Sequence, residues 1–66
     1  MVVVVNGAAR EGPEGTTVAG LIESLGMGSG AVAAEVNQKL VPKRSHAGTA
    51  LREGDKVELV SLVGGG

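Results

Sequence analysis

The sequence holds few side chains that could do chemistry on their own. It has one histidine, His46, which directly follows Ser45, and it has no cysteine. Adjacent residues seldom face each other, and both a catalytic dyad and a metal site need further partners. We therefore expect no catalytic residue and no metal ligand, and we interpret His46 as a solvated loop residue.

A glycine-rich segment at residues 26–30 superficially resembles a loop that binds phosphate. Such loops follow a strand and begin a helix, so that the helix N-terminus meets the anion. Here the glycines come after an expected helix and before an expected strand. This polarity indicates the end of a helix followed by a flexible connector.

The residues that point to chemistry stand at the end of the sequence: Gly64, Gly65 and Gly66. Glycine has no Cβ, so such a tail can lie in a channel too narrow for other residues. Three extended residues reach about 10 Å, enough to carry a terminal carboxylate into the active site of another protein. A carboxylate is a poor acyl donor and requires activation, for which ATP is the obvious source through a mixed anhydride. We predict that Gly66 reacts and that Gly64 and Gly65 permit threading.

The preceding residues predict the domain that positions this tail. β-Branched and alternating segments predict strands at residues 2–5, 8–11, 31–37, 39–41 and 56–62. Asn6 and Gly7 predict a hairpin turn between the first two strands, and the valine run of the first strand is typical of a central position. At residues 16–26, apolar residues with helical spacing predict one amphipathic helix that buries Val18, Leu21, Ile22 and Leu25.

The order of these elements predicts an α+β fold of the β-grasp (ubiquitin-like) type. This is a mixed sheet of about four to five strands with one main helix across one face. The first and last strands would run parallel, because the helix carries the chain over the sheet between them. Residues 1–63 would form the domain, and residues 64–66 would form a flexible C-terminal glycine tail.

A second feature predicts contact with a partner. If alternate residues of the first and last strands face the helix, four apolar side chains point to the opposite face of the sheet. These side chains are Val2, Val4, Val60 and Leu62. One helix cannot cover both faces, and an exposed apolar patch usually marks a partner site. We therefore predict that these four residues dock a partner.

Composition excludes several classes of partner. The net charge is −1, and the sequence has no aromatic residue on which a nucleic-acid base could stack. No apolar stretch approaches the roughly 18 residues of a membrane span, and the first residues lack the pattern of a signal peptide. We expect a cytoplasmic protein that binds neither nucleic acid nor a membrane.

Together these features resemble the ThiS family of sulfur carrier proteins, the small ubiquitin-like proteins of thiazole and thiamin biosynthesis. The resemblance covers nearly the whole sequence. The residues that carry it are a first strand ending in Asn6-Gly7, the segments 14–18, 21–25 and 32–37, Val41-Pro42, and above all residues 51–60 followed by Val63-Gly64-Gly65-Gly66. The glycine-rich loop at residues 26–30 departs from the family pattern.

The resemblance implies a mechanism in which partners do the catalysis. An adenylating enzyme related to ubiquitin-activating enzymes would use Mg-ATP to adenylate the Gly66 carboxylate. Sulfur from cysteine, passed through a desulfurase persulfide, would displace AMP and leave a thiocarboxylate. Thiazole synthase would then take this sulfur. The carrier would bind no cofactor itself and would not be an enzyme.

Three other functions remain open from the sequence. The chain resembles the small subunit of molybdopterin synthase in fold and tail, although that subunit is usually somewhat longer. A sulfur carrier for another pathway would have the same sequence features. A ubiquitin-like protein modifier that forms isopeptide bonds is the more distant alternative.

Overall fold

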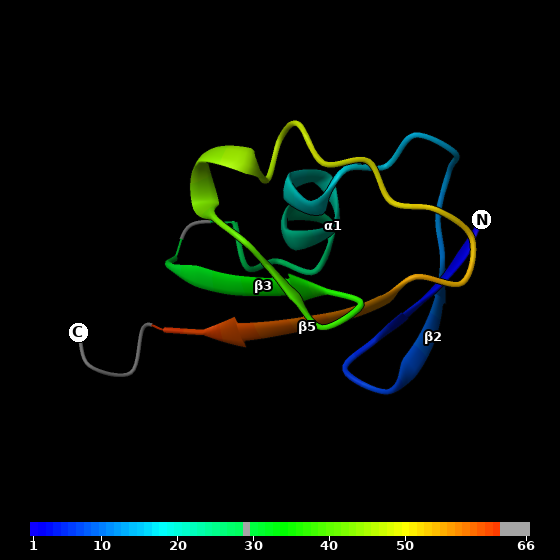
Figure 1. Ribbon diagram of the computed structural model, residues 1–66, viewed down its shortest axis with the longest axis horizontal. Coiled ribbons are helices and arrows are strands. Elements are labelled where there is room, and N and C mark those ends of the chain that lie inside the picture. Colours follow the sequence, from blue (N-terminus) through cyan, green and yellow to red (C-terminus); the bar gives the residue numbers. More distant parts are fainter. Residues whose placement is uncertain (29, 63–66) are drawn as a thin grey trace.

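The computed structural model describes residues 1–28 and 30–62 of the 66-residue chain. The order of elements is the predicted one (Figure 1). They are β1 (Val2–Val5), β2 (Ala8–Glu11), α1 (Val18–Ser24), β3 (Val32–Val36), β4 (Lys39–Val41), the 3₁₀ turn η1 (Lys43–Ser45) and β5 (Lys56–Ser61). The predicted domain boundary at residue 63 lies outside the described residues.

The five strands form one mixed sheet in the order β2-β1-β5-β3-β4. β1 and β5 are parallel neighbours, as predicted, and the other three pairings are antiparallel. Figure 1 shows α1 lying across one face of the sheet. This arrangement confirms the predicted β-grasp fold and places β5 between β1 and β3.

Two tight hairpins set the register at the two edges of the sheet. Asn6 and Gly7 join β1 to β2 with positive φ angles of 50° and 84°, as a two-residue turn of type I′ requires. The connection from β3 to β4 repeats this geometry, because Asn37 and Gln38 have φ angles of 53° and 69°. The first turn was predicted from the asparagine–glycine pair. The second turn, Asn37-Gln38, has no glycine and was therefore not predicted as a turn of this type.

The core lies between the sheet and α1. Its buried side chains are Val3, Val5, Ala34, Val57 and Leu59 from the sheet, Val18, Leu21 and Ile22 from α1, and Leu51 from the connection before β5. Three of the four predicted helix positions are therefore in the core, and Leu25 is partly buried against it. The alternation along β1 and β5 has the predicted phase.

The connection between β4 and β5 crosses the start of α1 and completes its hydrogen bonding. Val18 N donates to the carbonyl of Thr49 at 2.9 Å, and Ala19 N donates to the carbonyl of His46 at 3.0 Å. These N–H groups belong to the first turn of the helix, where no intrahelical partner exists. The connection is thus fixed to the helix rather than looped out.

His46 is a structural residue of this connection. The prediction that it is solvated is wrong, because its side chain is buried and its residue is only 8% exposed. Its Nε2 lies 3.0 Å from the carbonyl oxygen of Val41, so the buried ring has a hydrogen-bond partner. The ring therefore links the end of β4 to the connection over α1.

Gly20 offers the first testable change. A Cβ at this helical position would lie 3.5 Å from Thr17 Oγ1 and 3.8 Å from Thr16 Cγ2, both ordinary van der Waals distances. We expect Gly20→Ala to stabilise the domain by about 1 kcal/mol, since alanine restricts the unfolded chain and suits a helix interior. Urea unfolding measures this. A loss of stability would mean that the N–H of residue 20 no longer bonds the Thr17 hydroxyl, which it contacts at 3.1 Å.

Candidate functional site

The predicted reacting residue, Gly66, and the predicted threading residues, Gly64 and Gly65, lie outside the described residues. The last residue that the structure describes is Leu62, which directly follows β5. In sequence, β5 is therefore the strand that precedes the glycine segment. The part of the candidate site that the structure describes is therefore β5 with its neighbours β1 and β3.

Two asparagine side chains fix β5 to the rest of the sheet. Asn6 Nδ2 donates to the carbonyl of Leu59 at 3.1 Å, and Leu59 N donates to Asn6 Oδ1 at 2.9 Å. The amide thereby pairs like a strand residue and extends the contact between β1 and β5 past the end of β1. On the other side, Asn37 Oδ1 accepts from Lys56 N at 3.0 Å. Both asparagines therefore hold the strand that leads to the glycines.

Replacing Asn6 with glycine should expose the contribution of its amide. Glycine tolerates the positive φ of the turn, so the change removes the two hydrogen bonds to Leu59 without straining the hairpin. We expect Asn6→Gly to lower the free energy of unfolding by about 2 kcal/mol, since each bond contributes about 1 kcal/mol. Gly7→Ala, which strains the turn and keeps the amide, is the matched comparison. An unchanged urea midpoint for Asn6→Gly would contradict this role.

The side chains of β5 alternate between the core and the outer face of the sheet, the face away from α1. Val57 and Leu59 are buried, whereas Val60 and Leu62 are 57% and 56% exposed. The predicted orientation of Val60 is confirmed, and Leu62, which follows β5, is exposed; the role of both in docking stays a prediction.

The four apolar residues predicted for docking do not form one continuous patch. Val4 pairs with Lys56 at the start of β5, and Val2 lies beside Gly54 in the turn before this strand. Val60 lies four residues after Lys56 along β5, which places it about 13 Å from Lys56. Lys56 and Glu58 occupy the same face of β5 between them, because alternate residues share a face. The strands overlap only where β1 ends and β5 begins, which strand alternation alone could not reveal.

Different neighbours surround Val60. The antiparallel register places Ala33 opposite Val60 and Glu35 opposite Glu58, and it places Leu40 of β4 opposite Glu35. Leu40 is 68% exposed. We call Ala33, Glu35, Leu40, Glu58 and Val60 the outer-face patch. Sequence reasoning missed its members on β3 and β4, because the register between strands gives no signal within either strand.

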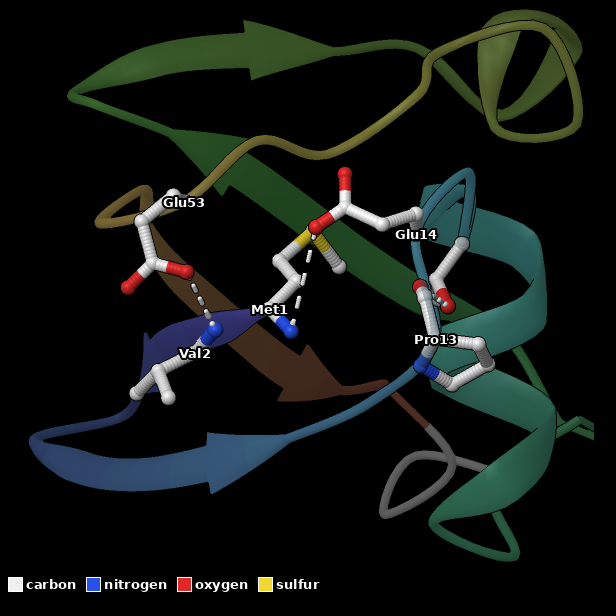
Figure 2. A network of polar contacts seen from close by, with 6 residues as sticks. Met1, Val2, Pro13, Glu14 and Glu53 are labelled. Carbon is white, nitrogen blue, oxygen red and sulfur yellow. Dashed lines mark hydrogen bonds and ion pairs between the residues drawn. The ribbon is translucent and has the colours of Figure 1, made fainter.

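The start of the chain is tied to the turn that precedes β5 (Figure 2). Val2 N donates to Glu53 Oε1 at 2.9 Å, and Gly54 N donates to the carbonyl of Val2 at 2.7 Å. The terminal ammonium of Met1 lies 3.9 Å from a carboxylate oxygen of Glu14. The two hydrogen bonds position β1 against the turn before β5, and the ion pair ties Met1 to the connection between β2 and α1.

A groove of about 670 Å³ runs between β2 and α1, with apolar walls that include Met1, Val3, Leu21, Leu25 and Leu51. Across residues 1–28 and 30–62, no group of three or more histidine, aspartate or glutamate side chains is placed to hold a metal ion. In the same stretch, no helix has the length and apolar composition needed to cross a membrane.

Comparison with known proteins adds sequence relatives of two kinds. The chain is 44% identical over 66 residues to the thiazole synthase of Paramagnetospirillum magneticum (strain ATCC 700264 / AMB-1) and 35% identical over 66 residues to that of Magnetococcus marinus (strain ATCC BAA-1437 / JCM 17883 / MC-1). Each match covers 100% of this chain and 20% of the relative, so the chain spans about a fifth of their length. It is also 34% identical over 62 residues to the uncharacterized protein ycf40 of Porphyra purpurea, covering 94% of this chain and 87% of that protein.

Solved structures share the whole fold. The crystal structure of the thiamine biosynthesis protein ThiS from Geobacter metallireducens has a TM-score of 0.81 at 29% identity, over 100% of both chains. A solution structure of a thiamine biosynthesis protein from the same organism gives 0.79 at 29% identity, over 100% of this chain and 88% of that one. The ThiS family itself matches residues 3–66. Since both the family match and the shared fold extend over nearly every residue, this chain belongs to the ThiS family.

Proposed function

We propose that this protein is a sulfur carrier of thiamin biosynthesis whose Gly66 carboxyl group carries the sulfur. The match to the ThiS family over residues 3–66, which includes the terminal glycines, is the observation that supports this most strongly. The position of β5 agrees with it, because this strand leads from the core of the domain directly towards Gly64 and its successors.

The chemistry begins with activation of Gly66 by an adenylating enzyme that uses Mg-ATP. A carboxylate oxygen of Gly66 attacks the α-phosphorus of ATP, pyrophosphate leaves, and an acyl adenylate forms. A persulfide from a cysteine desulfurase then attacks the carbonyl carbon, and AMP leaves with the electron pair of the C–O bond. A thiol reduces the sulfur–sulfur bond of the resulting acyl disulfide, which releases the thiocarboxylate.

In this proposal the carrier supplies recognition and reach, while its partners supply catalysis. The absence of cysteine from the sequence suits this role, since the chain presents no thiol that would compete for its own activated carboxyl group. The adenylate makes the carbonyl carbon electrophilic, and the sulfur that replaces the oxygen is the better nucleophile in the next transfer.

Thiazole synthase is the sulfur acceptor that we propose. Two proteins named thiazole synthase each contain a stretch similar to the whole of this chain, at 44% and 35% identity. A carrier-like stretch within a longer synthase supports a functional pairing between the two. The thiocarboxylate sulfur of Gly66 would be passed to the thiazole ring at the active site of the synthase.

Intact-mass spectrometry tests the proposal. The chain is incubated with the adenylating enzyme, ATP and sulfide, and we expect a mass gain equal to the exchange of one oxygen for one sulfur. Omitting ATP is the control and should abolish the gain. An unchanged mass in the complete reaction would contradict the sulfur-carrier function. Appearance of the chain in conjugates of higher mass with other proteins would indicate a protein modifier instead.

A further inference from the structure

The turn between β1 and β2 contains two residues that can react with each other. In an asparagine–glycine pair, the backbone nitrogen of the glycine can attack the side-chain amide carbon of the asparagine before it. Glycine favours this attack, because no Cβ shields its nitrogen and its backbone bends freely. Asn6 and Gly7 are the only such pair in the sequence. Deamidation is therefore chemically easiest at this turn.

The surroundings of Gly7 leave its nitrogen accessible. Both residues of the turn are exposed, and a Cβ at Gly7 would meet no atom within 4 Å. Within residues 1–28 and 30–62, no backbone carbonyl accepts a hydrogen bond from the N–H of Gly7. Water and hydroxide can therefore reach this N–H and remove its proton, which is the step that makes the nitrogen a nucleophile.

The side chain of Asn6, in contrast, is held at both of its polar atoms. Its Nδ2 donates to the carbonyl of Leu59 at 3.1 Å, and its Oδ1 accepts from Leu59 N at 2.9 Å. Attack on Cγ makes this carbon tetrahedral and moves Oδ1 and Nδ2 out of the plane in which Leu59 holds them. Because both hydrogen bonds must break first, the folded chain should react only when the hairpin opens away from β5.

We propose that Asn6 is a deamidation site, protected in the folded chain by its pairing with Leu59 and exposed when the β1–β2 hairpin opens. The deprotonated nitrogen of Gly7 attacks Cγ of Asn6, and a C–N bond forms. Nδ2 takes up a proton and leaves as ammonia with the electron pair of its own C–N bond, which completes a five-membered succinimide. Water then adds to one of the two ring carbonyls and the ring C–N bond breaks, leaving aspartate or isoaspartate at position 6.

Either product disrupts the contact between β1 and β5. Aspartate can still accept from Leu59 N, but it replaces the donor Nδ2 with a carboxylate oxygen that faces the carbonyl of Leu59. The two oxygens repel each other, and the carbonyl loses its hydrogen-bond partner. Isoaspartate lengthens the backbone of a two-residue turn and so also disturbs the register of the hairpin. The modification therefore loosens β5, the strand that precedes the glycine segment in sequence.

The turn between β3 and β4 provides an internal control. Asn37 has a φ of 53°, close to the 50° of Asn6, and its amide is also hydrogen-bonded, to Lys56 N and to the carboxylate of Asp55. The residue that follows it is Gln38, whose side chain shields the backbone nitrogen. Asn37 should therefore deamidate more slowly than Asn6 even when the chain is unfolded.

Peptide mass spectrometry tests both the site and its protection in the full chain. The chain is held at the same mildly alkaline pH in buffer and in concentrated urea, and is then digested with trypsin. Cleavage after arginine and lysine releases the two asparagines on separate peptides, residues 1–10 and 11–39. We expect peptide 1–10 to gain the mass of exchanging NH2 for OH about tenfold or more faster in urea than in buffer. In urea, peptide 11–39 should react about tenfold more slowly than peptide 1–10.

Two variants separate reactivity from protection. In urea, Gly7→Ala should slow deamidation of Asn6 about tenfold, because a Cβ shields the nitrogen and folding plays no part. In buffer, Asn6→Asp reproduces one product and should have a lower urea midpoint than the wild type. Equal rates in buffer and urea would overturn the protection by Leu59, and equal rates at Asn6 and Asn37 in urea would overturn the assignment of the site. A wild-type urea midpoint for Asn6→Asp would overturn the effect on β5.

Discussion

A variant that lacks Gly66 is expected to form no thiocarboxylate with the adenylating enzyme, ATP and sulfide, and to unfold at the wild-type temperature. Its new terminal carboxyl group, on Gly65, falls short of the reacting position by one residue, about 3.5 Å. Since a misplacement of about 1 Å can cost on the order of a hundredfold in rate, this shortfall should abolish activation. Stability should not change, because Leu59 is the last core residue within residues 1–28 and 30–62 and the deleted glycine adds no side chain. Intact mass and a thermal melt measure the two outcomes.

Gly65 tests threading separately from reactivity. Gly65→Trp keeps a terminal Gly66 but adds a large side chain one residue before it, so we expect activation to be lost if the tail enters a narrow channel. Gly65→Ala is the graded comparison and should retain more activity than the tryptophan variant. Full activation of Gly65→Trp would refute the channel while leaving Gly66 as the reacting residue. Sulfur gain by the variant without Gly66 would refute the reacting residue itself.

Much of the fold could be predicted because local signals agreed with one another. The helix had an apolar stripe from Val18 to Leu25, a threonine before it and Gly26 after it, and the structure uses each of these. Thr17 accepts a hydrogen bond from Gly20 N, and Gly26 has a φ of 77°. The parallel pairing of β1 and β5 could be predicted because a helix lies between the first hairpin and the later strands. This prediction needs only the order of the elements along the chain.

The remaining features depend on registers and contacts between distant segments. The amide of Asn6 was interpreted only as part of a turn, yet it bonds Leu59, 53 residues away. Glu35 and Glu58 belong to separate predicted strands, and only the β3–β5 register places them opposite each other. His46 and Leu51 lie in a connection of mixed composition, and their burial depends on its path across α1. No periodicity within those segments encodes that path.

The same distinction explains why the candidate site could be predicted only in part. The proposal that Gly66 reacts rests on one end of the sequence and needs no register. The outer-face patch is made by three strands, and alternation along β5 predicts the direction of Val60 but not the side chains beside it. The neighbours of Val60 on β3 and β4 therefore required the structure, whereas the prediction for Gly64, Gly65 and Gly66 needed only the sequence.

Leu59→Asp and Val60→Asp place the same charge at neighbouring positions of β5 and should have opposite consequences. Leu59 is 4% exposed, and an unpaired carboxylate there costs about 4 kcal/mol or more. A domain of this length has a total stability of roughly 3–10 kcal/mol, so we expect Leu59→Asp to unfold it. Val60 is 57% exposed, and its substitution should leave the melting temperature close to that of the wild type.

The folded Val60→Asp variant should lose affinity for the adenylating enzyme by about 30-fold or more. It removes an exposed apolar side chain and would place an unpaired carboxylate in the interface. Circular dichroism melts and titration calorimetry separate stability from binding. Unfolding of Val60→Asp would mean that β5 has the opposite phase. A folded variant that binds with wild-type affinity would mean that Val60 lies outside the surface that the enzyme recognises.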